Sequence, residues 1–190
     1  IVELEDLALS TPGLAFEDYS SSFSAAPVMR GLTQINVSSE VQNVATFVDG
    51  VYIQRNYAVD ISLADVSRVE VVKGPQSALF GRSAFAGAVQ YVTKDPSDVL
   101  EGDLFYSGNS EYDNEVRGSV SIPINDELGM LVNGYAWDSQ GYYKNVATDD
   151  YVGGGNGAGG SVTVKWEPND SIGVKWRTEY SADNYDVAAQ

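Results

Sequence analysis

The chain has 190 residues, enough for one domain and part of a second, and its 27 acidic residues outnumber 11 Lys and Arg residues to give a formal net charge of −16. A polyanion of this kind repels a nucleic-acid backbone, so nucleic acid is not an expected partner. The lack of both cysteine and histidine excludes a disulfide framework, a zinc–thiolate site and the commonest general base.

Tyrosine and glycine are frequent, with 12 and 19 residues, which is more typical of an exported β-protein than of a cytosolic enzyme. No apolar run approaches the roughly 20 residues that a transmembrane helix requires. No signal peptide with a basic and an apolar region is visible at Ile1. We therefore expect an internal piece of a mature or truncated protein, with no catalytic residue, metal or cofactor.

Short elements separated by loops are predicted for the first part of the chain. A helix with apolar residues on one side precedes Pro12-Gly13, which ends it. Asp49-Gly50 is a hairpin-turn signal between two short strands. The predicted elements are the helix within residues 1–16, strands at 28–32, 46–48 and 51–53, loops at 20–27, 34–40 and 54–60, and a short helix at 61–66.

A strand, a tight corner and a returning strand are predicted between residues 68 and 94. Valines alternate with charged residues in the first strand. Gly74-Pro75 ends it, because proline has no N–H to offer a neighbouring strand. The three glycines Gly74, Gly81 and Gly87 predict positive φ angles or a close approach to another surface. Taken alone, the stretch is also compatible with an ordinary soluble α/β hairpin.

Short motifs follow one another in a fixed order between residues 30 and 94. They are Arg30-Gly31-Leu32, Phe47-Val48-Asp49-Gly50-Val51-Tyr52, Arg68-Val69-Glu70-Val71-Val72-Lys73-Gly74-Pro75, Leu79-Phe80-Gly81, Ala86-Gly87-Ala88-Val89 and Thr93-Lys94. In this order and at this spacing they closely resemble the plug domain of TonB-dependent outer-membrane receptors. The resemblance implies a structural or gating role for Gly31, Asp49, Gly50, Arg68, Glu70, Lys73, Gly74, Pro75, Gly81, Arg82 and Gly87.

Longer alternating strands are predicted after Pro96-Ser97-Asp98, at residues 100–107, 115–122, 128–138, 161–166 and 171–181. All except 128–138, whose facing the pattern does not settle, place apolar residues on one face and charged or polar residues on the other. Strands of this kind, joined alternately by short turns and longer loops, fit an outer-membrane β-barrel with a polar lumen. A soluble β-sandwich also has alternating strands and remains an alternative.

The predicted fold is therefore an α+β plug domain followed by the first strands of a transmembrane antiparallel β-barrel. Residues 1–98 are expected to be the plug domain without its N-terminal part, and residues 99–190 the first five barrel strands. A complete barrel of this family would close with about 22 strands.

Other candidate sites are weaker. Residues 74–83 lack the spacing and the lysine of a phosphate-binding loop. The glycine-rich stretch Gly153–Gly160 is predicted to be a flexible external loop. Asp149-Asp150 fits a solvated acidic tip better than a cation site.

Basic plug residues are expected to hold the plug inside the barrel, although simply solvated charges are the alternative. The residues concerned are Arg30, Arg68, Lys73 and Arg82, and their expected partners are the lumen-facing carboxylates Glu101, Asp103 or Glu115. Carried over by position, the substrate-binding candidates are the outward tips of the plug, Arg30 and Gln54-Arg55-Asn56-Tyr57. An exposed loop without a ligand role is the alternative for these residues.

The resemblance implies TonB-dependent active transport of a scarce nutrient, most often a ferric siderophore, across the bacterial outer membrane, with no chemical reaction of the ligand. The implied partners are outer-membrane lipid, the ligand, and the TonB complex, which acts through a TonB box that these residues do not contain. Siderophore, haem, cobalamin and oligosaccharide remain open as substrates. A passive porin or structural barrel protein, and a soluble all-β ligand-binding module, are the alternative functions.

Overall fold

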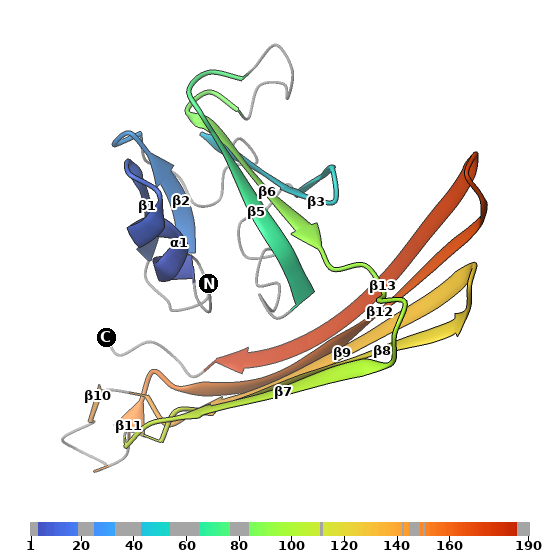
Figure 1. Cartoon of the computed structure of the whole chain (residues 1–190). Helices are drawn as coiled ribbons and strands as arrows, with labels where there is room; N and C mark the ends of the chain where they lie inside the picture. Colours follow the sequence, from blue (N-terminus) through green and yellow to red (C-terminus); the bar gives the residue numbers. More distant parts are fainter. Residues whose placement is uncertain are drawn as a thin grey trace. The chain divides into compact units, whose positions relative to one another are not determined.

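The computed structural model divides the chain into two compact units, residues 1–94 and residues 95–190 (Figure 1). It describes residues 4–18, 25–32, 43–53, 65–76, 84–110, 112–141, 143–144, 149 and 151–185. The expectations for Gln54, Arg55, Asn56, Tyr57, Gly81 and Arg82, for the loop at 34–40, and for most of the helix at 61–66 lie outside these ranges.

The first unit contains one short helix and two small sheets. Strands β1 and β2 form an antiparallel pair, and the second sheet has the order β4-β3-β6-β5, in which only β3 and β6 are parallel. No helix among the described residues is long and apolar enough to cross a membrane. The elements are α1 (Leu4–Ser10), β1 (Leu14–Asp18), β2 (Ala25–Met29), β3 (Val44–Val48), β4 (Val51–Ile53), β5 (Val66–Lys73) and β6 (Gly87–Thr93).

One hydrophobic cluster joins the helix, the β1–β2 pair and the larger sheet of this unit. Leu7 of α1, Met29 of β2 and Val89 of β6 are among its buried members. Burying one such side chain stabilises a fold by about 1.5–3 kcal/mol. Tyr91 belongs to the same cluster, and its burial raises the pKa of its hydroxyl above the ordinary range. Packing against a shared core therefore holds these short elements together.

Three predictions for the first unit are wrong. Residues 14–18 form strand β1, and β2 already begins at Ala25 inside the predicted loop 20–27. Pro27 fits in β2 because this strand pairs with β1 alone in its sheet, so the missing N–H leaves no second neighbour unpaired. The strand predicted at 28–32 ends at Met29, since Arg30 and Gly31 have left-handed φ angles of 54° and 75° that turn the chain. Val66, predicted to end a helix, begins β5.

The second unit is a five-stranded antiparallel sheet with the order β13-β12-β9-β8-β7 and a separate small hairpin, β10–β11. All five strands predicted for this part of the chain are confirmed as strands. We call the end with the turns at 125–128 and 169–172 the turn end, and the other the loop end. The elements are β7 (Glu101–Gly108), β8 (Asn114–Asn125), β9 (Leu128–Ser139), β10 (Tyr143–Lys144), β11 (Tyr151–Val152), β12 (Gly155–Asn169) and β13 (Ile172–Tyr185).

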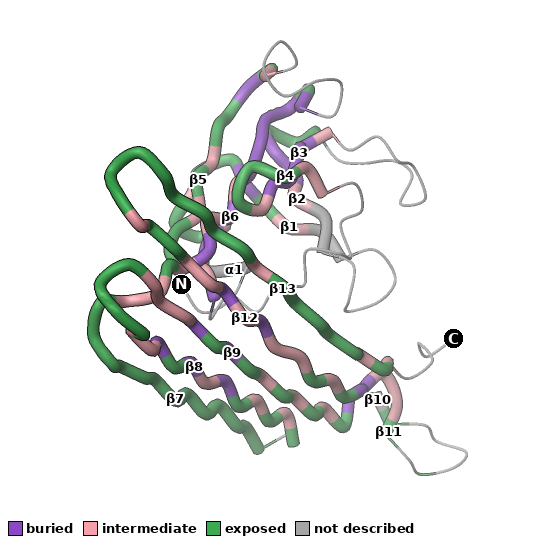
Figure 2. The backbone as a smooth tube through the Cα atoms, turned by 90° about the vertical axis from the view of Figure 1, so that its right-hand side faces the viewer, coloured by how far each residue is buried: buried purple, intermediate pink, exposed green. Residues whose placement is uncertain are grey.

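The sheet has two different faces, and the alternation along its central strands can be followed in Figure 2. On the polar face, Ser119, Asn133 and Ser161 lie side by side on β8, β9 and β12 and are buried. On the apolar face, the neighbouring row contains Val120 and Val132, both exposed. The facing of the third predicted strand, β9, is thereby settled. Further exposed residues of the apolar face are Leu104, Tyr106, Val116, Trp166, Val174, Trp176 and Tyr180.

The prediction that Gly153–Gly160 is a flexible loop is wrong for most of its length, because β12 begins at Gly155. The glycines in this part of β12 make room for large side chains from both neighbouring strands. A Cβ on Gly159 would lie 2.6 Å from the Tyr135 ring, and one on Gly157 would collide with Asp183 and Trp137. Because glycine has no Cβ, these side chains can lie directly over the backbone of β12.

Candidate functional site

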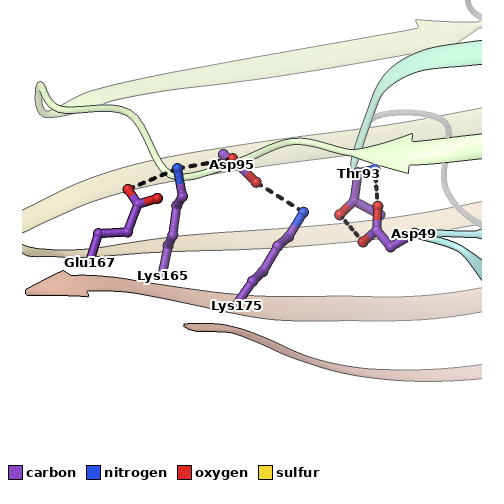
Figure 3. Close-up of polar contacts among 6 residues, drawn as sticks. All are labelled: Asp49, Thr93, Asp95, Lys165, Glu167 and Lys175. Carbon is purple, nitrogen blue, oxygen red and sulfur yellow. Dashed lines mark hydrogen bonds and ion pairs between the residues drawn. The ribbon is translucent and has the colours of Figure 1, made fainter. Parts of the chain in front are cut away.

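The Asp49-Gly50 turn, predicted as a hairpin turn, joins β3 to β4 and also binds the end of β6. Both carboxylate oxygens of Asp49 accept hydrogen bonds from Thr93, one from its backbone N–H at 2.9 Å and one from its hydroxyl at 2.6 Å (Figure 3). The backbone N–H of Asp49 donates to the carbonyl oxygen of Tyr91 at 2.9 Å. Thr93 is 2% exposed, so these bonds satisfy polar groups that water cannot reach. We call this arrangement the Asp49–Thr93 clamp.

A second group of motif residues meets near the start of β6. The Lys73 ammonium donates to the carbonyl oxygen of Pro12 at 2.7 Å, and the Arg30 N–H donates to that of Gly13 at 2.8 Å. The Gly74 N–H donates to the carbonyl oxygen of Ala86 at 2.9 Å. Three turns that are far apart in sequence are thus tied together, and Arg30 lies exposed in one of them.

Gly87, the first residue of β6, is in this group because of its close contacts. A Cβ at this position would meet the sulfur of Met29 and, at 2.5 Å, the carbonyl oxygen of Val72. The prediction that this glycine allows a close approach is confirmed. A side chain here would separate β6 from both β2 and β5.

In the second unit, Asp95 is bound by two lysines that face each other across β12 and β13. Its carboxylate oxygens lie 2.9 Å from Lys175 Nζ and 3.3 Å from Lys165 Nζ, and Lys165 also pairs with Glu167 at 3.0 Å (Figure 3). Lys165 and Lys175 are direct cross-strand partners, an arrangement that is unfavourable for like charges unless an anion lies between them. Asp95 supplies that anion.

Two opposing effects act on the Asp95 carboxyl group. Burial works against its ionised form, but the hydrogen bonds and positive charges of Lys175, and then of Lys165, outweigh burial. The pKa of Asp95 is therefore held below its ordinary value of 3.8. The Asp95 carboxyl group is therefore ionised near neutral pH, where both lysines are positively charged.

Residues 95–97, which we call the strap, cross the polar face of the sheet at its turn end. After Asp95 at β12 and β13, Pro96 passes over Gly129 of β9, where an added Cβ would lie 2.9 Å from the proline ring. The Ser97 N–H then donates to the hydroxyl of Ser121 on β8 at 2.6 Å. The strap is thus fixed on four successive strands before β7 begins.

Sequence analysis missed the strap because no motif marks it. Its partners on β12 and β13 lie far along the chain, and Asp95 is part of an ordinary strand-ending Lys-Asp-Pro sequence. One signal was available. The alternation places Lys165 and Lys175 on the charged faces of two consecutive predicted strands, and two lysines brought together by the pairing of these strands require a nearby acid.

Two of the three carboxylates expected to receive basic plug residues, Asp103 and Glu115, have partners on their own sheet. Glu115 pairs with Arg117 at 2.7 Å, and Asp103 accepts a hydrogen bond from Ser119. Of the basic plug residues, Arg68 pairs with Glu70 at 2.7 Å on its own strand. The expected pairing between plug and barrel stays a prediction.

An aromatic and acidic group occupies the polar face nearer the loop end. The Trp137 indole N–H donates to Asp183 at 2.9 Å, and its ring centroid lies 5.3 Å from that of Tyr185. This contact spans β12 from β9 to β13, over the glycines described above. At the tip of the neighbouring loop, Asp149 pairs with Lys144 at 2.8 Å and is largely exposed, as expected for a solvated acidic tip.

Comparison with known proteins gives consistent matches. Residues 1–88 match the family model described as the TonB-dependent receptor plug domain. The pesticin receptor of Yersinia pestis is 28% identical over 177 residues, which cover 90% of this chain and 25% of that protein. The hemin receptor of Yersinia pestis is 29% identical over 119 residues, covering 63% of this chain and 17% of that protein.

The structure of the ferric yersiniabactin uptake receptor of Yersinia pestis matches with a TM-score of 0.73 and 28% sequence identity. The match covers 91% of this chain and 27% of that receptor, so both units are represented in it. The chain spans about a quarter of the length of the pesticin receptor that it matches.

Proposed function

The chain belongs, through the plug domain in its first half, to the TonB-dependent receptors of the outer membrane, and we propose on this premise that the whole protein actively imports a ferric siderophore. The observation that carries the proposal is the combination of a plug domain with a sheet that has one polar and one apolar face. A passive diffusion pore has no need of a plug. A soluble module would leave the apolar face of the sheet in water.

The five-stranded sheet is proposed to be the beginning of a closed barrel of about 22 strands. Its strands β8, β9, β12 and β13 have 12, 12, 15 and 14 residues, which is sufficient for tilted membrane strands of about 9–11 residues. The exposed apolar face fits lipid, and the polar face fits a wet lumen. Further strands would pair with β7 and β13, which have one neighbour each in this sheet.

Transport in this proposal moves the ligand without changing it chemically. The TonB complex would act on the plug through a segment outside these residues, and the bonds of the plug would yield to that force. Polar contacts in a wet lumen suit this task, because water replaces each broken bond at small net cost. The expected pairs of Arg30, Arg68, Lys73 and Arg82 with barrel carboxylates belong to this proposal.

Ligand contact is proposed for Arg30 and for Gln54, Arg55, Asn56 and Tyr57. The exposed Arg30 is held by its backbone N–H, which donates to the carbonyl oxygen of Gly13, so its guanidinium is proposed to be available for an anionic ligand. Names of the matched proteins support a ligand that carries iron, since they include a hemin receptor and a ferric enterobactin receptor.

Uptake of radioactive iron by cells that carry the full-length receptor as their sole ferric receptor tests the proposal. We expect uptake with at least one ferric siderophore in iron-starved cells, and its loss in a matched strain without TonB. Arg30→Ala should weaken ligand binding, whereas the exposed control Lys144→Ala should not. Uptake that persists without TonB would establish a passive pore instead. Uptake of hemin but of no siderophore would show that the imported ligand is hemin and not a ferric siderophore.

A further inference from the structure

The apolar face of the five-stranded sheet ends at the loop end in a single row of amide and carboxylate side chains. Four neighbouring strands, which lie side by side in Figure 1, contribute one residue each. On β9 this residue is Asp138, six positions after Val132, so the row belongs to the apolar face. We call it the polar row, and its members are consecutive cross-strand partners: Asn114 (β8), Asp138 (β9), Asn156 (β12) and Asn184 (β13).

The next five rows of this face, toward the turn end, have a different composition. In the described strands they contain apolar residues, glycine, tyrosine and one threonine, and no charged side chain. The change in polarity therefore occurs between one row and the next. In order from the polar row, the five rows are Tyr106, Val116, Ala136, Ala158 and Ala182; Leu104, Gly118, Gly134, Gly160 and Tyr180; Gly102, Val120, Val132, Val162 and Thr178; Ile122, Met130, Val164 and Trp176; and Leu128, Trp166 and Val174.

Tyr106 in the first apolar row has its polar end directed at the polar row. The residue is 66% exposed, and its hydroxyl donates to the side-chain oxygen of Asn114 at 2.7 Å. Gly108 makes room for this hydroxyl, which would lie 2.6 Å from a Cβ at that position. Within the row, the Asn184 amide donates to that of Asn156 at 3.5 Å. A tyrosine ring on an apolar surface with its hydroxyl on the polar side is typical of a membrane–water interface.

The span of the apolar rows matches the thickness of a membrane. At the turn end, Trp166 and Trp176 are 45% and 56% exposed, and tryptophan is enriched at membrane interfaces. Ten residue steps separate Asn156 from Trp166 along β12, which is about 33 Å at roughly 3.3 Å per residue. Barrel strands are tilted by about 35–45°, so the span along the membrane normal is about 25 Å, the usual height of the apolar band of a barrel.

We propose that the polar row lies in the lipid headgroup layer of the outer leaflet and sets the depth of the receptor in the membrane. The inference rests on the proposed barrel and extends it by naming the side chains that meet the headgroups. The longer connections of the sheet are at the loop end, which is the external side of such a barrel.

The chemistry of the two surfaces supports lipid as the partner. The five uncharged rows complement hydrocarbon, in which amide and carboxylate groups would lose their hydrogen bonds to water. Headgroups and interfacial water supply donors for the Asp138 carboxylate, and both donors and acceptors for the asparagine amides.

Depth-dependent fluorescence quenching tests the proposal in the full-length receptor reconstituted into lipid bilayers. Single cysteines that carry bimane at Asn156 and Val162 compare the polar row with the middle of the band on one strand. Lipids brominated near the end of the acyl chain should quench the Val162 label at least threefold more than the Asn156 label. A nitroxide on the headgroup should reverse this order. A label at Ser181, on the polar face, is the control and should respond to neither lipid.

A substitution in the row tests whether it sets the depth. Asp138→Leu should allow hydrocarbon to reach the next strand, so that brominated lipid quenches the Asn156 label at least twofold more than before. Thr178→Leu, within the apolar rows, is the matched control and should change nothing. Unchanged quenching in the Asp138→Leu variant would overturn the role of the row.

Two outcomes separate failure of this inference from failure of the proposed barrel. Equal quenching by brominated lipid at Asn156 and Val162 would overturn the boundary and leave the barrel in place. A Val162 label that neither lipid quenches would show that protein, such as a second copy of the receptor, covers the face, and would overturn both. Iron uptake by the same variants reports on the import function separately.

Discussion

Replacing Asp95 by asparagine should loosen the strap without unfolding the sheet. The carboxylate makes two ion pairs, and it is 48% exposed, so solvent screening limits each pair to about 0.2–1 kcal/mol. Its loss also leaves Lys165 and Lys175 directly opposite each other, which costs a further 0.2–1 kcal/mol or so. The sum is about 0.6–3 kcal/mol, with about 1–2 kcal/mol as the middle of that range, and it lowers the free energy of local opening of residues 95–97.

Amide hydrogen exchange of the full-length receptor measures this opening at the Ser97 N–H, which donates to Ser121. A loss of about 1–2 kcal/mol corresponds to exchange about 5–30 times faster in the Asp95→Asn variant. Adding Lys175→Met should recover part of the protection, because the repulsion between the lysines is then removed. Asp98→Asn, a nearby exposed position, is the control. Unchanged exchange at Ser97, or no recovery in the double variant, would refute the reasoning.

Three further predictions concern the clamp, the pH dependence of the strap and the glycines of β12. Asp49→Ala should destabilise the plug by about 2–4 kcal/mol, because it removes two charge-assisted hydrogen bonds to the buried Thr93. Asp49→Asn should destabilise it less. Amide hydrogen exchange at the Thr93 N–H measures both effects. Because folding lowers the pKa of Asp95, the stability that its ion pairs give to the strap is fully present above pH 3.8 and is lost as the pH falls through the lower pKa of the folded state. Protection of the Ser97 N–H that fell between pH 7 and pH 5 would contradict the lowered pKa of Asp95. Gly157→Ala should lower the thermal midpoint by breaking the tryptophan–aspartate hydrogen bond across β12, at a cost of about 1–3 kcal/mol, whereas Gly134→Ala, whose Cβ would meet only one atom at 3.8 Å, should leave it unchanged.

The strands of the second unit could be predicted because their side chains alternate with period two. On β8, Val120 lies on one face and Ser119 on the other, as the pattern requires. The facing of β9 came only from its pairing with β8, which places Val132 beside Val120 and Asn133 beside Ser119. The turn at Asp49-Gly50 could be predicted for a similar reason, since a two-residue turn depends on its own residues. Local rules of this kind need no knowledge of distant neighbours.

The remaining features depend on partners far along the chain. Gly157 was predicted to lie in a loop, because a glycine has no side chain that could contribute to a strand pattern. The structure explains the glycine by the Trp137 and Asp183 side chains of two other strands, which occupy the space of its Cβ. The turn at Arg30 was predicted as strand, because an arginine with a positive φ has no sequence signal apart from the glycine after it.

The junction between the two units has a mechanical consequence. The Lys94 N–H is bonded to the carbonyl oxygen of Asp65 in the first unit, and the next residue, Asp95, is bonded to β12 and β13 in the second. Consecutive Cα atoms are only about 3.8 Å apart, so the covalent chain has no slack at this point. Any larger displacement of residue 94 must first break bonds on one side or the other. The hydrogen bond of Lys94 and the ion pairs of Asp95 are therefore the first interactions that a force along the chain would load.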